Sequence, residues 1–178
     1  MILRYLCLTL GLVFYIYAQA EAQTCRSETA IPSATPTRRF LVHGDGTVTD
    51  TATGLMWARC AEGLSGSDCA DGAATAFTWI EALTRARLST HAGYTDWRLP
   101  NVKELTSIVE ERCSNPAINL AVFPNVSSSA LFWSASPDVS YQEDPPRSYT
   151  WFVESSDGDA YQDLRNSSNN MRLVRSGQ

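Results

Sequence analysis

The sequence has almost no lysine and very little histidine. Lys103 is the only lysine among 14 basic residues, and the 178-residue chain contains two histidines, His43 and His91. Because 19 acidic residues outweigh the basic ones, the net charge is −5. The basic footprint of a nucleic-acid-binding protein is therefore missing, and we expect no nucleic-acid partner.

Catalytic motifs are also lacking. A serine or cysteine nucleophile needs a base within reach, but neither His43 nor His91 has a nucleophile motif beside it. Glycoside hydrolysis needs two acids that flank the scissile bond, whereas Glu110 and Glu111 are an adjacent pair of the kind common on protein surfaces. The sequence predicts that the protein is not an enzyme.

Long apolar runs are absent except at the N-terminus. Arg4 precedes an uncharged stretch from Leu6 to Tyr17, which ends in the small-x-small signals Ala18-Gln19-Ala20 and Ala20-Glu21-Ala22. This pattern predicts a signal peptide over residues 1–22, with an uncleaved anchor as the alternative. The run is shorter than the ~20 residues of a membrane span. We expect no span after cleavage, and a secreted, periplasmic or cell-surface location.

Four cysteines remain after cleavage, and none of them forms a C-x-x-C pair. An even number in an exported chain predicts two disulfides. Cys60 and Cys69 bracket a loop rich in Gly and Ser that closes easily, which leaves Cys25 to pair with Cys113. With only two histidines to assist, the spacing does not suit a zinc site, and we predict no resident metal.

The chain after the signal peptide divides into a lead-in and one domain. Residues 23–39 are polar, contain Pro32 and Pro36, and are predicted to be extended. Residues 40–178 have a length typical of a single domain. Their first part alternates β-prone runs at 40–42, 47–50 and 55–57 with Gly-rich turns, which predicts an antiparallel meander.

Two helices are predicted to follow the meander. The first spans residues 75–88, with Ala76, Ile80, Leu83 and Arg87 on one stripe, Trp79 beside it, and an outer Glu81–Arg85 pair. The second begins at Asn101, which with Glu104 forms a variant capping box. Segments 131–134, 149–153, 160–164 and 171–175 are predicted to form a second, late antiparallel sheet. This order of elements predicts an α+β fold.

A set of motifs occurs in order between Phe40 and Arg175. They are Gly44-Asp45-Gly46-Thr47-Val48-Thr49-Asp50, Thr53-Gly54-Leu55-Met56-Trp57, Gly93-Tyr94-Thr95-Asp96-Trp97-Arg98-Leu99-Pro100-Asn101, Lys103-Glu104-Leu105, Asn115-Pro116-Ala117-Ile118, Val122-Phe123-Pro124, Phe132-Trp133-Ser134-Ala135-Ser136 and Val174-Arg175. In this combination the chain resembles the C-terminal domain family of the Legionella collagen-like protein. The resemblance implies exported, often surface-attached proteins. It also implies a fold related to C-type-lectin-like and formylglycine-generating-enzyme-like domains, in which two helices flank a twisted antiparallel sheet and long late loops form the ligand face.

The resemblance further implies adhesion, because the name-giving member is an adhesin whose domain binds sulfated polysaccharides and supports biofilm formation. This chain departs from that member in two ways. It has no collagen-like repeat, and its net charge is negative, whereas a sulfated glycan needs Lys and Arg clusters. We therefore expect a non-catalytic module for adhesion or surface carbohydrate recognition, with a neutral or weakly charged glycan as its ligand.

Several residues of the shared motifs are predicted to be architectural. Tryptophan carries so much apolar area that Trp57, Trp97 and Trp133 are expected in the core, as is Trp79. Arg98 is expected to pair with Asp96 or Glu104, and Asn101 to cap the second helix. The alternative for Asp96-Trp97-Arg98 is a grip on an acidic ligand.

The predicted ligand site gathers rings and planar polar groups in the late loops, where sugars would stack on the rings and pair their hydroxyls. Its residues are Tyr141, Tyr149, Trp151, Asp157, Asp159, Tyr161, Arg165, Asn169 and Asn170. Asp157 and Asp159 would be the donors if calcium assisted, although an Asp-Gly-Asp turn explains them without a metal. The alternative function is a structural subunit that docks through these loops on another envelope or surface-appendage protein; the oligomeric state stays open.

Overall fold

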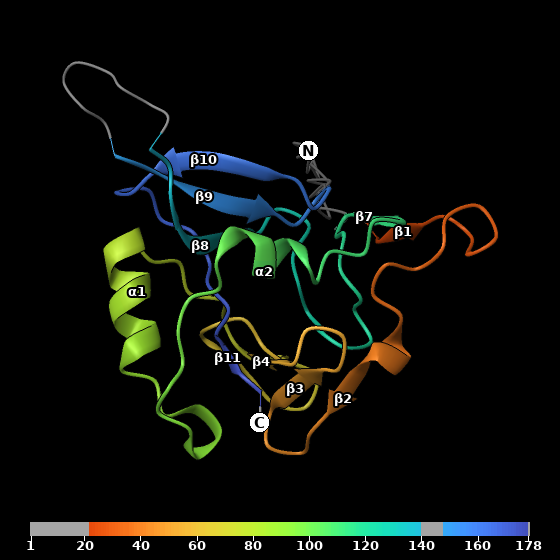
Figure 1. Cartoon of the computed structure of the whole chain (residues 1–178), viewed down its shortest axis with the longest axis horizontal. Helices are drawn as coiled ribbons and strands as arrows, with labels where there is room; N and C mark the ends of the chain where they lie inside the picture. Colours follow the sequence, from red (N-terminus) through yellow and green to blue (C-terminus); the bar gives the residue numbers. More distant parts are fainter. Residues whose placement is uncertain (1–21, 140–147, 178) are drawn as a thin grey trace, which may run out of the picture.

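Two antiparallel sheets form the framework of the domain in the computed structural model, which describes residues 22–139 and 148–177 (Figure 1). The four-stranded sheet has the order β11-β4-β3-β2 and consists of β2 (Phe40–Val42), β3 (Thr47–Asp50), β4 (Leu55–Ala58) and β11 (Val174–Ser176). The three-stranded sheet has the order β10-β9-β8 and consists of β8 (Leu131–Pro137), β9 (Tyr149–Glu154) and β10 (Ala160–Leu164). The predicted early meander and three of the four predicted late strands are confirmed.

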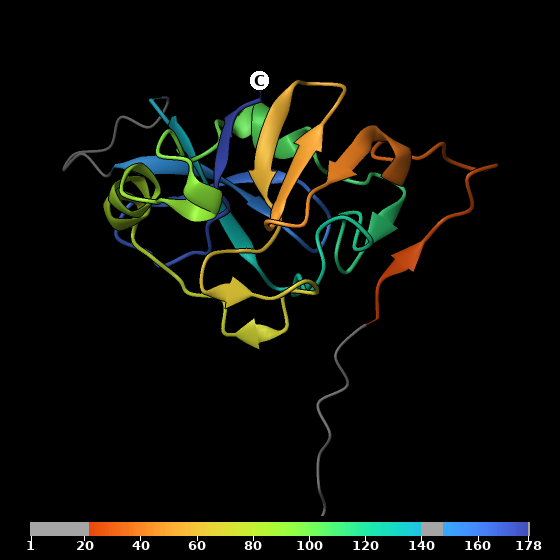
Figure 2. The same cartoon turned by 90° about the horizontal axis from the view of Figure 1, so that it is seen from below.

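Shorter elements fill the space around these sheets. Strand β1 (Thr24–Cys25) pairs with β7 (Cys113–Ser114), and β5 (Leu64–Ser65) pairs with β6 (Asp71–Gly72) in a hairpin that stands away from the sheets (Figure 2). Two α-helices, α1 (Trp79–Arg87) and α2 (Val102–Thr106), lie between the early and late strands in the chain, with 3-10 turns at Thr37–Arg39 and His91–Gly93. Antiparallel sheets with two α-helices agree with the α+β class. Within the described ranges, no helix has the length and apolar character needed to cross a membrane.

The last strand corrects the predicted topology. Segment 171–175 was expected in the late sheet, but β11 pairs with β4 of the early sheet and places Val174 opposite Trp57, both fully buried. Asn170, directly before this segment, forms a bridge with Phe132 of the late sheet. The chain therefore passes from the late sheet at Asn170 to the early sheet at Val174. This path buries the apolar side chains of Met171, Leu173 and Val174.

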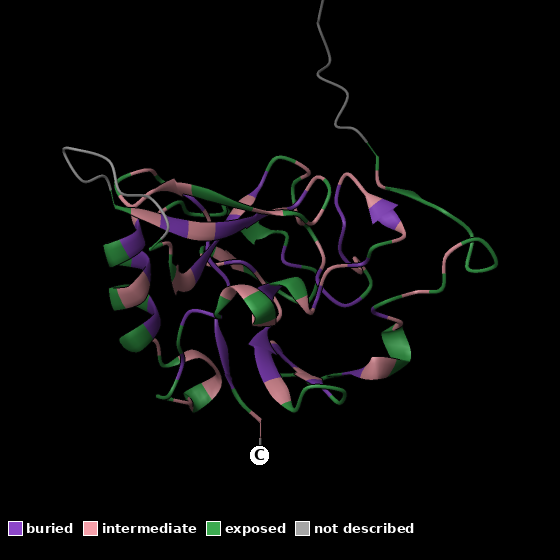
Figure 3. Cartoon of the chain, turned by 45° about the horizontal axis from the view of Figure 1, so that its top comes forward, coloured by how far each residue is buried: buried purple, intermediate pink, exposed green. Residues whose placement is uncertain are grey.

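Helix α1 starts later, and faces differently, than its sequence pattern predicts. Thr78 and Glu81 form a capping box that sets the start, so Glu81 makes no pair with Arg85; Arg85 instead binds Glu62 at 2.6 Å. The buried residues are Trp79, Ala82 and Ala86, while Ile80 is 59% exposed. Figure 3 shows the buried side of the helix turned toward the sheets and the exposed side turned outward. The indole N–H of Trp79 donates to the Ser134 carbonyl of β8 at 2.9 Å, and this long-range contact orients the helix.

The core has two parts, and the tryptophans lie in both. One part gathers Trp57, Phe123 and Phe132 with Leu105 of α2, and the other gathers Trp79, Trp97 and Trp133 with Phe152 of β9. Trp57 and Trp133 are completely buried, and Trp97 is 3% exposed.

The motif around Trp97 is held together by two ion pairs and a helix cap. The guanidinium of Arg98 binds both carboxylate oxygens of Glu104 at 2.7 Å, and Glu104 completes a capping box with Asn101. Asp96 pairs instead with Arg175 at 2.6 Å, and this hydrogen bond lowers the pKa of the Asp96 carboxyl. The motif therefore joins α2 to the last strand.

Both predicted disulfides are confirmed. Cys60–Cys69 closes the loop that carries β5, and Cys25–Cys113 fastens the lead-in strand β1 to β7. The lead-in has a second anchor at Glu110, which is 2% exposed and accepts hydrogen bonds from the Ser33 and Thr35 hydroxyls and from two backbone N–H groups. The lead-in is thus fastened to the domain at Cys25 and at residues 33–35, whereas residues 26–30 between them are exposed.

Candidate functional site

The structure separates the residues of the predicted late-loop site into different surroundings. Tyr141 lies outside the described residues. Asp157 and Asp159 lie at the turn between β9 and β10. Tyr161 follows on β10 and is 41% exposed, with its ring tilted against Phe152. The Tyr161 hydroxyl donates to Asp157 at 3.3 Å, and the Asp157 charge raises the pKa of that hydroxyl.

The side chain of Asp157 stabilises the turn in which it lies. Asp157 accepts the backbone N–H of Asp159 at 2.9 Å through one oxygen and the Tyr161 hydroxyl through the other. In the described part of the chain, no three His, Cys, Asp or Glu side chains come together in a group suited to a metal ion.

Strand β9 contains Tyr149 and Trp151, and Arg165 directly follows β10. The Arg165 guanidinium stacks on the Trp79 ring with 4.4 Å to the ring centroid, and its Nε donates to the Tyr149 carbonyl. Tyr149 and Trp151 are both half-buried. Arg165 therefore secures α1 to the end of β10 and is engaged by the protein itself.

Asn169 and Asn170 have different surroundings although they are neighbours. Asn169 is 5% exposed, its side-chain amide donates to Asp163 at 3.2 Å, and its backbone pairs with Phe77. Asn170 is half-buried and lines a pocket. Of the nine predicted ligand residues, Asn170 is the one found among the described residues that line this pocket.

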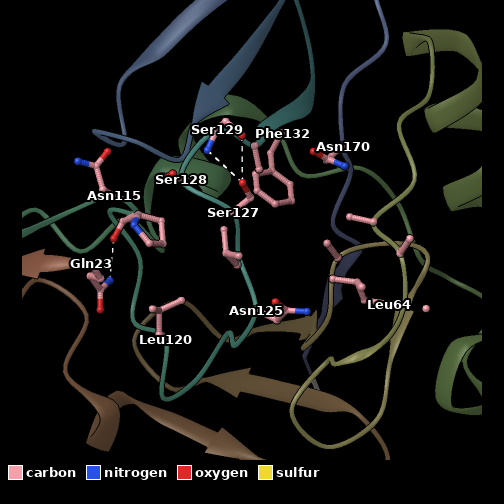
Figure 4. Close-up of a pocket in the computed structure, with 17 residues that line it drawn as sticks. Gln23, Leu64, Asn115, Leu120, Asn125, Ser127, Ser128, Ser129, Phe132 and Asn170 are labelled. Atoms are coloured by element: carbon pink, nitrogen blue, oxygen red, sulfur yellow. Dashed lines mark hydrogen bonds between the residues drawn. The ribbon is translucent and has the colours of Figure 1, made fainter. Parts of the chain in front are cut away.

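This pocket, which we call the serine pocket, has a volume of about 670 Å³, within the usual range for small-ligand sites. Its polar lining consists of amides and hydroxyls: Gln23, Asn115, Asn125, Asn170 and the run Ser127–Ser129. The larger apolar residues of the lining are Leu64, Pro116, Leu120, Val126 and Phe132. Figure 4 shows the serine run between Asn115 on one side and Phe132 and Asn170 on the other.

The described lining of the serine pocket contains no Asp, Glu, Lys, Arg or His. A positive charge nevertheless lies behind one wall. Arg172 is 1% exposed and its guanidinium lies 5.6 Å from the centroid of the Phe132 ring. Burial lowers the pKa of Arg172 to about 9, so this side chain is charged at neutral pH.

Local backbone geometry shapes the pocket wall. Asn115 and Asn125 both have positive φ, at 55° and 54°, a conformation that asparagine tolerates better than most residues. The backbone N–H groups of Asn115 and Ala117 donate to Ser156 and Ser155, while the Ser155 hydroxyl donates to the Ser127 carbonyl. The serine run is therefore held against the end of β9.

The lead-in supplies part of the same wall. The side-chain amide of Gln23 donates to the carbonyls of Pro116 and Ile118, both at 2.7 Å. The adjacent strand β1 and its disulfide to Cys113 hold Gln23 in this position. Three segments far apart in the chain thus meet at the pocket. In the sequence, the uncharged run from Asn125 to Ser129 and the Asn115-Pro116 pair are polar stretches of this wall, but neither indicates that it meets Gln23.

Both histidines have hydrogen-bond partners outside the serine pocket. His43 Nε2 lies 2.9 Å from the Thr49 hydroxyl, and His91 Nε2 lies 3.1 Å from the Gly46 carbonyl. Both line a neighbouring pocket with Cys60, whose sulfur is in a disulfide. Cys60 is therefore unable to act as a nucleophile in the oxidised protein.

The fold and the pocket together define an α+β domain with two disulfides and a cavity whose described lining is uncharged. Residues 46–175 match the Lcl C-terminal domain, and the chain belongs to this family. A search among curated proteins finds no match. Family membership indicates a surface-associated domain, and the two disulfides fit an extracellular location.

Proposed function

We propose that the protein is an exported, non-catalytic binding module that recognises a neutral surface carbohydrate in the serine pocket. The observation that carries this proposal is the lining of the serine pocket, whose described residues supply amides and hydroxyls and carry no charge. Neutral saccharides present hydroxyl groups that both donate and accept, and carboxamide and serine side chains match both roles. A sulfated chain would meet no cation among the described lining residues.

The non-catalytic part of the proposal rests on the surroundings of the candidate reactive groups. His43 and His91 are hydrogen-bonded to a threonine hydroxyl and a backbone carbonyl, and the four cysteines of the described chain are paired in disulfides. Glu110 holds the lead-in. These groups have structural roles, which supports binding without chemistry.

Calcium is not needed for this mode of binding. Asp157 and Asp159 lie at the β9–β10 turn, outside the described lining of the serine pocket, and Asp157 already accepts hydrogen bonds from its own turn. We expect glycan binding to be unchanged by EDTA. If EDTA abolished binding and calcium restored it, Asp157 and Asp159 would belong to the ligand site, as acidic residues do in C-type lectins.

A glycan array with two variants tests both the function and the place of binding. Ser128 lines the pocket and makes no side-chain hydrogen bond within the described residues, so Ser128→Trp should obstruct the pocket and abolish binding without unfolding the domain. Ser176→Trp, on an exposed position of β11, is the matched control. The double variant Trp151→Ala/Tyr161→Ala should keep its ligand. If that double variant alone lost binding, the late loops would be the site.

The second candidate function is a structural subunit that docks on another envelope or surface-appendage protein. The observation that favours it is the exposed Tyr161 on the edge strand β10, because an exposed ring on a strand edge suits a protein partner. An array on which no glycan binds, together with capture of an envelope protein that the Tyr161→Ala variant no longer binds, would favour this function.

A further inference from the structure

The serine pocket offers more apolar contact than a plain hexose polymer uses. Leu64, Leu120 and Val126 line it together with Phe132, which is 7% exposed and so presents little of its ring. No tryptophan or tyrosine is among the described lining residues. Glucans that stack their flat faces on an open aromatic ring would find no such platform here. A ligand with a compact apolar group, such as a methyl, fits this lining better.

The side-chain amides of the pocket have unused hydrogen-bonding capacity. Asn125 and Asn170 each donate one amide N–H, to the carbonyls of Cys69 at 2.7 Å and Thr75 at 3.4 Å, which leaves each side chain a second N–H and its carbonyl oxygen. Asn115 makes no side-chain hydrogen bond to the described residues and offers both a donor and an acceptor. This set matches a ligand that carries an amide of its own.

The charge behind Phe132 selects against a cationic ligand. Arg172 donates to the Ala58 and Arg59 carbonyls, and it lies 4.8 Å from the centroid of the Phe123 ring, but no carboxylate contacts it in the described structure. Its Nη2 is buried and finds no partner among the described residues. An unneutralised charge in a low-dielectric interior acts strongly at short range. It disfavours an ammonium group in the pocket and favours a carbonyl oxygen.

We infer that the serine pocket binds an N-acetylated hexosamine unit of a surface glycan. The acetamido methyl packs against the apolar part of the lining, to which Leu64, Leu120, Val126 and Phe132 contribute. The acetamido N–H donates to an asparagine carbonyl, and the acetamido carbonyl accepts from Asn115. The inference rests on the proposed carbohydrate function and specifies its ligand class. It predicts that the N-acetyl group, rather than the sugar hydroxyls, determines affinity.

Three trisaccharides that differ only at the 2-position test this inference by calorimetry on the oxidised protein near neutral pH. They are the β-1,4 trimers of N-acetylglucosamine, glucose and glucosamine. We expect the N-acetylated trimer to bind roughly tenfold more tightly than the glucose trimer, because a methyl contact and an amide hydrogen bond are lost. The glucosamine trimer, which carries ammonium groups, should bind most weakly.

Variants connect the preference to the pocket. Asn170→Ala and Leu64→Ala should each reduce affinity for the N-acetylated trimer severalfold and narrow its advantage over the glucose trimer. Leu41→Ala, at an exposed leucine on β2, is the matched control and should leave both affinities unchanged. Urea unfolding of every variant identifies any that is not folded, and Ser128→Trp then serves as the pocket variant.

The outcomes separate failure of the inference from failure of the proposed function. Equal or tighter binding of the glucose or glucosamine trimer overturns the N-acetyl inference and leaves carbohydrate recognition standing. Absence of binding for every saccharide on the array and for all three trimers overturns both.

Discussion

Trp97 shows how a residue with the appearance of a ligand contact can serve the fold. It lies between Asp96 and Arg98, an acid and a base that a binding site would use. Its indole N–H donates to the His91 carbonyl at 2.9 Å, and the His91 and Tyr94 rings meet it edge-on at 5.6 and 6.3 Å. The neighbouring charges are taken by Arg175 and Glu104. The motif therefore joins the loop before α2 to the last strand.

Replacing Trp97 with alanine should destabilise the protein strongly. Truncation of a large buried aromatic typically costs about 3–5 kcal/mol, and Trp97 is 3% exposed. Urea unfolding followed by circular dichroism measures the change in the free energy of unfolding. Thr95→Ala, an exposed position in the same loop, should change it little. An unchanged midpoint for Trp97→Ala, with binding lost, would make Trp97 a ligand platform.

Glu110 should make stability depend on pH in the acid range. Burial alone would raise its pKa, but hydrogen bonds from Ser33, Thr35 and the backbone of Thr35 and Ala34 outweigh burial and hold the pKa below its usual value of 4.5. A carboxyl whose pKa is lower in the folded than in the unfolded protein contributes stability above the unfolded pKa. That contribution is lost as pH falls through the folded pKa.

The measurement is a series of urea unfolding curves from about pH 6 to about pH 3. Wild type should lose stability below pH 4.5, and Glu110→Gln should lose less over the same range. At neutral pH the variant should be destabilised by about 1–3 kcal/mol, since buried donors lose a charged acceptor. Curves for the two proteins that run parallel across the acid range would show that Glu110 does not contribute this dependence.

At the level of elements, the features governed by local chemistry were predictable and those governed by distant contacts were not. The early meander follows from its Gly-rich turns, and the start of α2 follows from the Asn101 cap. The face of α1 could not be read from its own residues, because the bond from Trp79 to Ser134 of β8 sets its orientation. The partner of β11 depends on Trp57, more than a hundred residues earlier in the chain.

The serine pocket was unpredictable for the same reason. Its walls come from the lead-in, the stretch from Asn115 to Phe132, and Asn170, and no local pattern shows that they meet. The predicted late-loop site assumed that rings and amides close in sequence would converge on one ligand. Instead Arg165 is stacked on Trp79 and Asn169 is buried. The contact between the lead-in and the rest of the domain was predictable only through the Cys25–Cys113 disulfide.

The two disulfides should differ in their contribution to stability. Cys25–Cys113 links residues 88 apart in sequence, and Cys60–Cys69 links residues nine apart. On the chain-entropy argument, the longer loop constrains the unfolded state more, by roughly 2 kcal/mol. The double variant Cys25→Ala/Cys113→Ala should therefore lower the free energy of unfolding by more than Cys60→Ala/Cys69→Ala. The reverse order would show that strain or lost packing, rather than loop closure, dominates.

On the scale of the whole molecule, the positive charges are mostly engaged within the fold. Arg39, Arg85, Arg98 and Arg175 are paired with carboxylates at 2.5–2.7 Å, and Arg112 has two more distant acidic neighbours. Arg172 is buried, and Arg59 donates to backbone carbonyls. Besides Arg59, the described cations without a carboxylate partner or a ring contact are Arg26, Arg38, Arg87 and Lys103, which lie on the lead-in, α1 and α2.

This distribution predicts that the protein does not bind sulfated polysaccharides under physiological conditions. A polyanion binds through clustered cations that remain accessible, and salt at about 0.15 M screens isolated surface charges beyond ~8 Å. With a net charge of −5, the protein should pass through a heparin column in physiological salt. The variant Glu111→Lys/Asp159→Lys, with two exposed acids reversed, should be retained more than wild type if charge balance decides. Firm retention of wild type that resists this salt would mean that a cationic site outweighs the net charge, and the sulfated-glycan binding implied by the family resemblance would apply to this chain as well.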